Sequence, residues 1–156
     1  EARAAGASNV AVGSLNGKAK VSVKQASLRC YGYSQKLSVL GTVNGDRADI
    51  SIYNASVNIH ANGELLTACG SLMGDSDVRI EGCTYSAESD GNQALIIGGR
   101  EGRSKLNITN ADVTMKVDSP DGTCTLASDE DITLSGGNIK VTLNGEKYGR
   151  VINRII

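Results

Sequence analysis

The chain has 156 residues, a net charge of −1 and a pI near 5.8, with 16 basic and 17 acidic residues interspersed along it. The only aromatic residues are five tyrosines, so the sequence lacks both the clustered basic surface and the stacking aromatics expected of a nucleic-acid-binding protein. No apolar stretch approaches the length of a membrane span. We therefore expect neither nucleic acid as a partner nor insertion into a membrane.

An internal repeat of about 28 residues runs along the whole chain. A unit of this length cannot bury its own apolar face and must stack on its neighbours as a solenoid. Apolar pairs recur at spacings of 29, 28, 28 and 26 residues: Val21/Val23, Ile50/Ile52, Val78/Ile80, Leu106/Ile108 and Ile132/Leu134. Within a repeat, apolar and polar residues alternate, which is the period of a β-strand.

Each repeat contains three short predicted strands, which in the second repeat cover residues 50–52, 55–59 and 66–70. Alternation sends Val57 inward and Ser56 and Asn58 outward. Residues that tolerate a left-handed backbone precede each middle strand, as at Asn54 and Asn110, and predict one corner of the coil. Glycine marks a second corner after the third strand at positions 13, 41, 70 and 98.

These features predict an all-β parallel β-helix of five to six coils of about 28 residues, with three short strands per coil and one domain over residues 1–156. The segment from Val10 to Gly13 matches the segment from Ser38 to Gly41, so the chain opens in the middle of a coil. We expect an excised piece of a longer, secreted protein. The ends of such a stack are strand edges, which favour end-to-end self-association.

No two of the four cysteines form a CxxC pair, and all four align with core positions of the repeat: Cys30, Cys69, Cys83 and Cys124. The repeat places Cys30 beside Ile59 and Cys124 beside Ile96. We expect buried free thiols, with a bridge between Cys69 and Cys83 as the alternative.

The sequence offers little for catalysis. His60 is the sole histidine, it ends a middle strand with its side chain outward, and no GxSxG nucleophile motif occurs. The glycine clusters lack the spacing of a phosphate-binding loop and are explained as corners. We therefore expect a protein that is not an enzyme.

A column of charge precedes the first strand of each coil. Stacking of equivalent residues about 4.8 Å apart is expected to crowd four carboxylates, those of Asp46, Asp49, Asp75 and Asp77. Like charges this close raise a pKa or recruit a cation, and an oxygen-rich cluster suits Ca²⁺. The alternative is a solvated ladder of salt bridges with Lys18, Lys20, Arg103 and Lys105.

A sugar-binding surface needs aromatic platforms beside polar side chains. Tyr31, Tyr33 and Tyr53 are the candidate platforms, whereas Tyr85 is expected in the core. Exposed polar positions of the middle strands, among them Arg29 and Asn58, provide hydrogen-bonding groups. This array suits an extended polysaccharide, and it also suits an ordinary solvated β-surface.

Residues 94–114, ALIIGGREGRSKLNITNADVT, resemble one unit of the repeat proteins on the surface of gut and cellulolytic Firmicutes. Those repeats show an apolar-Gly-Gly corner, a glycine-rich gap, an "ITI" strand, a small-residue turn and a "VTA" strand. The resemblance implies a right-handed β-helix on a secreted or wall-attached protein, in a group often labelled carbohydrate-binding. Some similar β-helices bind acidic polysaccharide and calcium. No binding residue of the family is carried over.

Together these observations predict a non-catalytic extracellular or cell-surface module that recognises a polysaccharide or a host surface ligand. The alternatives are a structural spacer of a larger surface protein and, third, a β-helix polysaccharide lyase or hydrolase. The connections between predicted strands are short, which disfavours the enzyme, because catalytic groups usually sit on loops held by a rigid scaffold.

Overall fold

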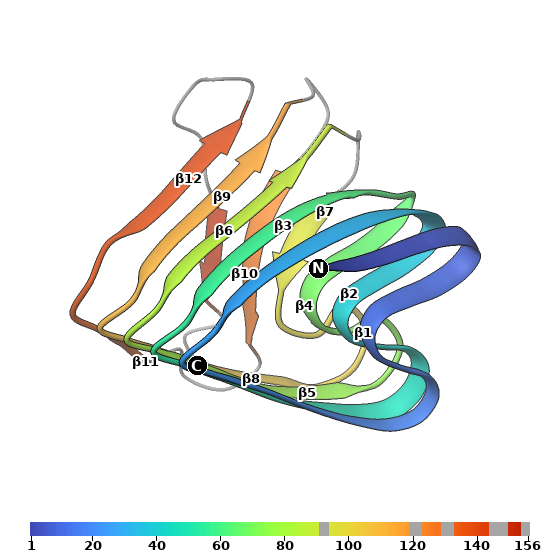
Figure 1. Cartoon of the computed structure of the whole chain (residues 1–156), viewed down its shortest axis with the longest axis horizontal. Coiled ribbons are helices and arrows are strands. Elements are labelled where there is room, and N and C mark those ends of the chain that lie inside the picture. Colours follow the sequence, from blue (N-terminus) through green and yellow to red (C-terminus); the bar gives the residue numbers. More distant parts are fainter. Residues whose placement is uncertain (91–93, 119–122, 129–132, 144–149, 154–156) are drawn as a thin grey trace.

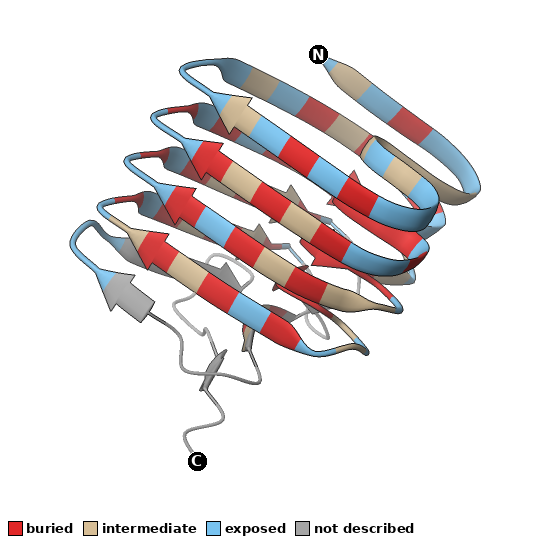
Figure 2. Ribbon diagram, turned by 90° about the horizontal axis from the view of Figure 1, so that it is seen from below, coloured by how far each residue is buried: buried red, intermediate tan, exposed pale blue. Residues whose placement is uncertain are grey.

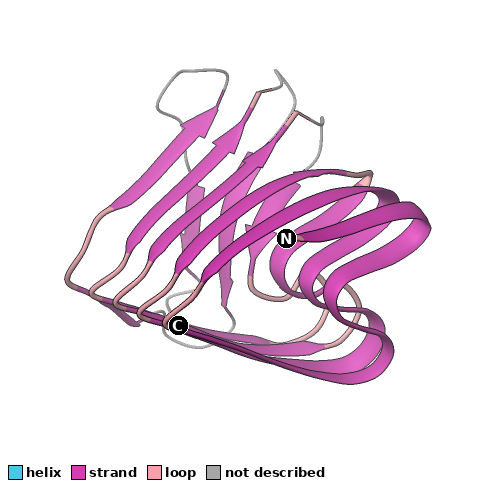
Figure 3. Cartoon of the chain, viewed as in Figure 1, coloured by secondary structure: helices cyan, strands magenta, loops and turns pink. Residues whose placement is uncertain are grey.

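The structure is a computed structural model that describes residues 1–90, 94–118, 123–128, 133–143 and 150–153. Over these residues the chain is all-β without helix, and its parallel strands stack as a β-solenoid of about four turns (Figures 1 and 3). The strands are β1 (Ala2–Lys24), β2 (Ser27–Tyr53), β3 (Ser56–Asn62), β4 (Leu65–Ser71), β5 (Asp75–Glu81), β6 (Thr84–Ser89), β7 (Ala94–Ile97), β8 (Ser104–Thr109), β9 (Asp112–Val117), β10 (Thr123–Ser128), β11 (Thr133–Ser135), β12 (Ile139–Leu143) and β13 (Arg150–Asn153).

Each strand pairs in parallel with the strand one turn along, so three sides build up around the core. The first side holds residues 27–33 of β2 with β3, β6, β9 and β12. The second holds residues 36–42 of β2 with β4, β7, β10 and β13. The third holds residues 47–53 of β2 with β5, β8 and β11. β1 lies against β2 along all three sides.

The predicted repeat is confirmed by the register. Val21 lies beside Ile50, Ile50 beside Val78, and Val78 beside Leu106, so that equivalent apolar residues stack turn upon turn. Alternation along the strands separates the core from solvent, as the red and pale-blue bands of Figure 2 show. Val57 is 1% exposed, whereas Ser56 and Asn58 face solvent.

The four cysteines are buried free thiols, as the sequence predicted. Cys30 lies beside Ile59 as expected, but Cys124 lies beside Leu95 and not beside Ile96. The connection between β9 and β10 is one residue longer than that between β6 and β7, and this shifts the alignment by one. Tyr85 is buried, as predicted.

The prediction of three short strands per coil holds only from the third turn. β1 and β2 run for 23 and 27 residues around two corners without a break. The ladder of β1 and β2 continues through the corner glycines, because Gly13 and Gly41 are themselves register partners. The corners there bend the strands instead of ending them.

The corner before each middle strand adopts the left-handed conformation that the sequence predicted. The φ angles are 49° at Gln25, 46° at Asn54, 63° at Gly82, 49° at Asn110 and 64° at Gly136. The backbone of this corner still bonds to the next turn: the amide of Asn54 donates to the carbonyl of Glu81 at 2.9 Å.

Glycines at positions 13, 41, 70 and 98 form a second column with φ between +113° and +142°. Successive turns approach so closely here that no side chain fits. A Cβ at Gly70 would lie 2.1 Å from the carbonyl oxygen of Gly98, and one at Gly41 would lie 2.0 Å from that of Gly70. The glycine column therefore lets the turns stack at the spacing of a β-sheet.

Gly70→Ala should destabilise the protein by about 3 kcal/mol or more, because the new methyl group meets backbone and the left-handed region strains alanine. Gly17→Ala is the matched control: Gly17 has φ +76°, but a Cβ there meets nothing within 4 Å. Its cost should stay near 1 kcal/mol. Chemical denaturation of both variants measures the difference, and equal losses would contradict the stacking argument.

Val57→Asp should abolish folding, because an unpaired carboxylate in the core costs several kcal/mol. Ser56→Asp, on the adjacent exposed position, should leave the melting temperature nearly unchanged. Circular dichroism with thermal melting tests both, and the reverse order would show that the inward and outward faces are misassigned.

Candidate functional site

The outer surface of the first side, over residues 27–33 of β2 and over β3, β6 and β9, carries two neighbouring tyrosines; we call it the tyrosine face. Outward residues of β2 alternate along the strand and lie beside outward residues of β3. The register pairs Arg29 with Asn58, Tyr31 with His60, and Tyr33 with Asn62. The structure thus brings together four of the five sugar-binding candidates, namely Arg29, Tyr31, Tyr33 and Asn58.

Tyr33 is the more open of the two rings, at 52% exposure, and its centroid lies 6.2 Å from that of His60. His60 faces outward as predicted, and its Nε2 atom lies 3.2 Å from a carboxylate oxygen of Asp90. The guanidinium of Arg3 lies 5.4 Å from the centroid of the Tyr31 ring. The face therefore combines aromatic rings with groups that donate and accept hydrogen bonds.

The sequence did not predict the contact of Arg3 with Tyr31 or that of Asp90 with His60. Asp90 lies two residues past Glu88, the register partner of His60, and so continues the outward alternation beyond the end of β6. The repeat alignment places Asp90 in the outward row of His60, but the contact between them depends on how the side chains extend across two strands.

Tyr53 does not join the tyrosine face. It ends β2 on the third side, where its register partners are Lys24 and Glu81, and it is 40% exposed. Tyr53 therefore lies on another side of the solenoid than Tyr31 and Tyr33.

The outer surface of the third side, over residues 18–24 of β1, 46–53 of β2, 75–81 of β5 and 103–109 at β8, carries the four aspartates; we call it the charged face. Asp49 and Asp77 are register partners, as predicted. Asp75, however, lies beside Arg47 and not beside Asp46. The expectation that all four aspartates stack in one cluster is wrong in this respect.

A β-bulge at Gly45 and Asp46 causes the difference. Asn16 pairs with Asn44, 28 residues on, whereas Lys18 pairs with Arg47, 29 residues on, so the second turn holds one extra residue. A Cβ at Gly74 would meet the carbonyl oxygens of both Gly45 and Asp46, at 2.2 and 2.5 Å. Two residues of one turn thus oppose one residue of the next, and Arg47 moves into the row of Asp75.

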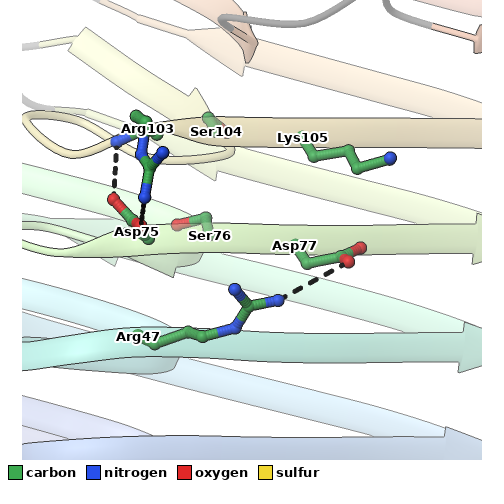
Figure 4. A pocket seen from close by; sticks show the side chains of 7 residues that line it. All are labelled: Arg47, Asp75, Ser76, Asp77, Arg103, Ser104 and Lys105. Carbon is green, nitrogen blue, oxygen red and sulfur yellow. Dashed lines mark hydrogen bonds and ion pairs between the residues drawn. The ribbon is translucent and has the colours of Figure 1, made fainter.

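Arginines engage three of the four carboxylates, and Figure 4 shows the contacts of Arg103 with Asp75 and of Arg47 with Asp77. Arg47 Nε lies 2.7 Å from Asp49 Oδ1, and Arg47 Nη2 lies 3.8 Å from Asp77 Oδ2. Asp77 also accepts from Arg79, whose Nε and Nη2 atoms both lie at 3.3 Å. Alternating charges of this kind form a ladder of salt bridges.

Asp75 is held most completely. It accepts hydrogen bonds from the backbone amide of Arg103 and from its Nη2 atom, both at 3.0 Å. The bond from the backbone amide, then that from the guanidinium, lowers the pKa of Asp75 below its ordinary value. Among the described residues no group of three or more His, Cys, Asp or Glu side chains is placed to hold a metal ion.

Burial makes two of the thiols, those of Cys30 and Cys124, poor nucleophiles. Burial raises the pKa of Cys30 to about 11 and that of Cys124 to about 12. Both thiols stay protonated near neutral pH, and a protonated thiol is a poor nucleophile and a poor metal ligand.

No protein-family model, curated protein or solved structure matches the chain. Within the described ranges, no helix is long and apolar enough to cross a membrane.

Millimolar Ca²⁺ should leave the melting temperature unchanged, because the carboxylates of Asp49, Asp75 and Asp77 already have arginine partners and a cation would have to displace them. Thermal melting in Ca²⁺ and in a chelator tests this. A rise of several degrees with Ca²⁺ would support the calcium site predicted from the sequence. Arg47→Gln is the informative variant, since it removes the cation that lies between Asp49 and Asp77.

Proposed function

We propose that this protein is a non-catalytic binding module that recognises an extended polysaccharide through its tyrosine face. The observation that carries the proposal is the placement of Tyr31 and Tyr33 on alternating positions of β2, beside His60 and Asn62 of β3. Aromatic rings offer a large apolar surface to the C–H faces of a sugar, and the neighbouring amides and the guanidinium of Arg29 offer hydrogen bonds to its hydroxyls.

The shape of the face supports a chain-like ligand. Outward positions repeat from strand to strand at about 4.8 Å, so polar side chains of β3, β6 and β9 continue the surface beyond the tyrosines. Asn58, Ser86 and Thr114 form one such row. A polymer that crosses the strands would meet hydrogen-bonding groups at regular intervals, whereas a small ligand would find no enclosing walls.

Short connections favour binding over catalysis. Two-residue corners join the third side to the tyrosine face between β2 and β3, between β5 and β6, and between β8 and β9. These corners cannot wall a cleft or exclude water from a reacting bond. An enzyme on such a scaffold would need longer loops to do so.

The proposal includes the finer features expected from the sequence: a right-handed coil of five to six turns, and secretion or display at a bacterial cell surface. The likeness of residues 94–114 to Firmicute surface repeats supports this setting. A host surface ligand in place of a polysaccharide would use the same face.

Tyr33→Ala should weaken binding to a polysaccharide identified on a glycan array by about tenfold, because the loss of one exposed stacking ring removes about 1 to 1.5 kcal/mol. Asn58→Ala should also weaken it, by a smaller factor. Isothermal titration calorimetry measures both variants against the unaltered protein.

Tyr53→Ala is the matched control, since Tyr53 is also an exposed tyrosine but lies on the third side. It should bind as the unaltered protein does. Equal losses in the two tyrosine variants would contradict the assignment to the tyrosine face. Absence of binding to every glycan would favour a structural spacer, and unsaturated products would indicate a lyase.

A further inference from the structure

The charged face holds two shallow hollows that adjoin and share Arg47 and Asp77. Lys20, Ser22 and Lys24 line the hollow over β1 and β2. Arg103 and Lys105 line the hollow over β5 and β8, which Figure 4 shows from close by. Together the hollows make one polar groove that crosses four neighbouring strand segments.

The charges of this groove fall into two groups. Arg47, Arg79 and Arg103 are engaged by the carboxylates of the face. Three lysines of β1, namely Lys18, Lys20 and Lys24, are exposed, and among the described residues no carboxylate lies within ion-pair distance of them. A ligand at the β1 end of the groove, where Lys20 and Lys24 line the hollow, would therefore displace no carboxylate from these lysines.

The face is basic within a slightly acidic chain. Its segments 18–24, 46–53, 75–81 and 103–109 contain seven Lys or Arg against five Asp or Glu, whereas the whole chain has 16 against 17. The remainder of the chain thus has nine basic and twelve acidic residues. Positive charge gathers on this side of the solenoid, and such a local field attracts anions.

We propose that the charged face binds a sulfated polysaccharide, with Lys18, Lys20 and Lys24 as its main contacts. This site is separate from the tyrosine face and does not depend on the function proposed for that face. The lysines stand at outward positions of one extended strand, so the Cα atoms of Lys20 and Lys24 lie about 13 Å apart. Cations spread in this way match a row of charges along a polymer and do not converge on a single small anion.

The residue types favour sulfate over carboxylate. Arginine is the residue suited to planar, bidentate recognition of a carboxylate. On this face the guanidinium groups of Arg79 and Arg103 already donate hydrogen bonds to Asp77 and Asp75. Lysine ammonium groups act as point charges with no planar selectivity, so they respond to charge density. Ser22 and Ser51, which are register partners between the charges, add hydroxyls that hydrogen-bond sugar oxygens.

The test measures binding of the protein to dextran sulfate at about 50 mM salt, with unmodified dextran, polygalacturonate and single-stranded DNA as comparison polymers. The double variant Lys20→Gln/Lys24→Gln should lose affinity for dextran sulfate by about tenfold or more and show a shallower salt dependence. Both side chains are exposed, so the melting temperature should not change. The unaltered protein should bind dextran sulfate more tightly than the other three polymers.

Lys36→Gln is the matched control, because Lys36 is an exposed lysine of β2 on the second side. Its affinity should stay within about twofold of the unaltered protein, as should that of Tyr33→Ala. Equal losses in Lys36→Gln and the double variant would overturn the proposal. So would binding of polygalacturonate or DNA as tight as that of dextran sulfate, or no binding of dextran sulfate at all.

Discussion

The close approach of successive turns at the glycine column is the constraint on which the rest of this structure depends. Gly41, Gly70 and Gly98 each present a carbonyl oxygen where a side chain of the neighbouring turn would otherwise lie. Only a residue without a Cβ leaves room for parallel strands at the spacing of a β-sheet. At another corner of the coil, left-handed residues such as Asn54 and Asn110 turn the chain from the third side to the first side of the next turn. Every outward side chain is then placed by its register.

That register explains why the two outer surfaces differ. On the first side no residue is inserted between β2 and β3, so Tyr31 and Tyr33 meet His60 and Asn62 directly. On the third side a single extra residue at Asp46 shifts the row by one and places Arg47 beside Asp75. The bulge converts a predicted cluster of like charges into a ladder of ion pairs. Lys18, Lys20 and Lys24 of β1, on the same face, have no carboxylate within ion-pair distance among the described residues.

The sequence was sufficient to predict the parallel coil, its left-handed corners and the burial of Val57, Tyr85 and the cysteines, because each rests on a local pattern that repeats at a constant period. It was insufficient where one turn holds one residue more than its neighbour, because the repeat does not show which residue is the inserted one. The 29-residue spacing between Val21 and Ile50 signalled an insertion in the second turn, but alignment on Gly45 and Gly74 put Asp46 in the row that Arg47 occupies. Likewise, the contact of His60 with Asp90 depends on side-chain reach, which periodicity does not encode.

The central claim is that a polysaccharide lies across the tyrosine face. The most direct test is to add a polysaccharide that the protein binds and to record, by nuclear magnetic resonance, the changes in the backbone amide chemical shifts. The account predicts that the shifts concentrate at residues 29–33 and 58–62. Shifts confined to residues 47–53 and 75–79, or spread evenly over all three sides, would contradict it.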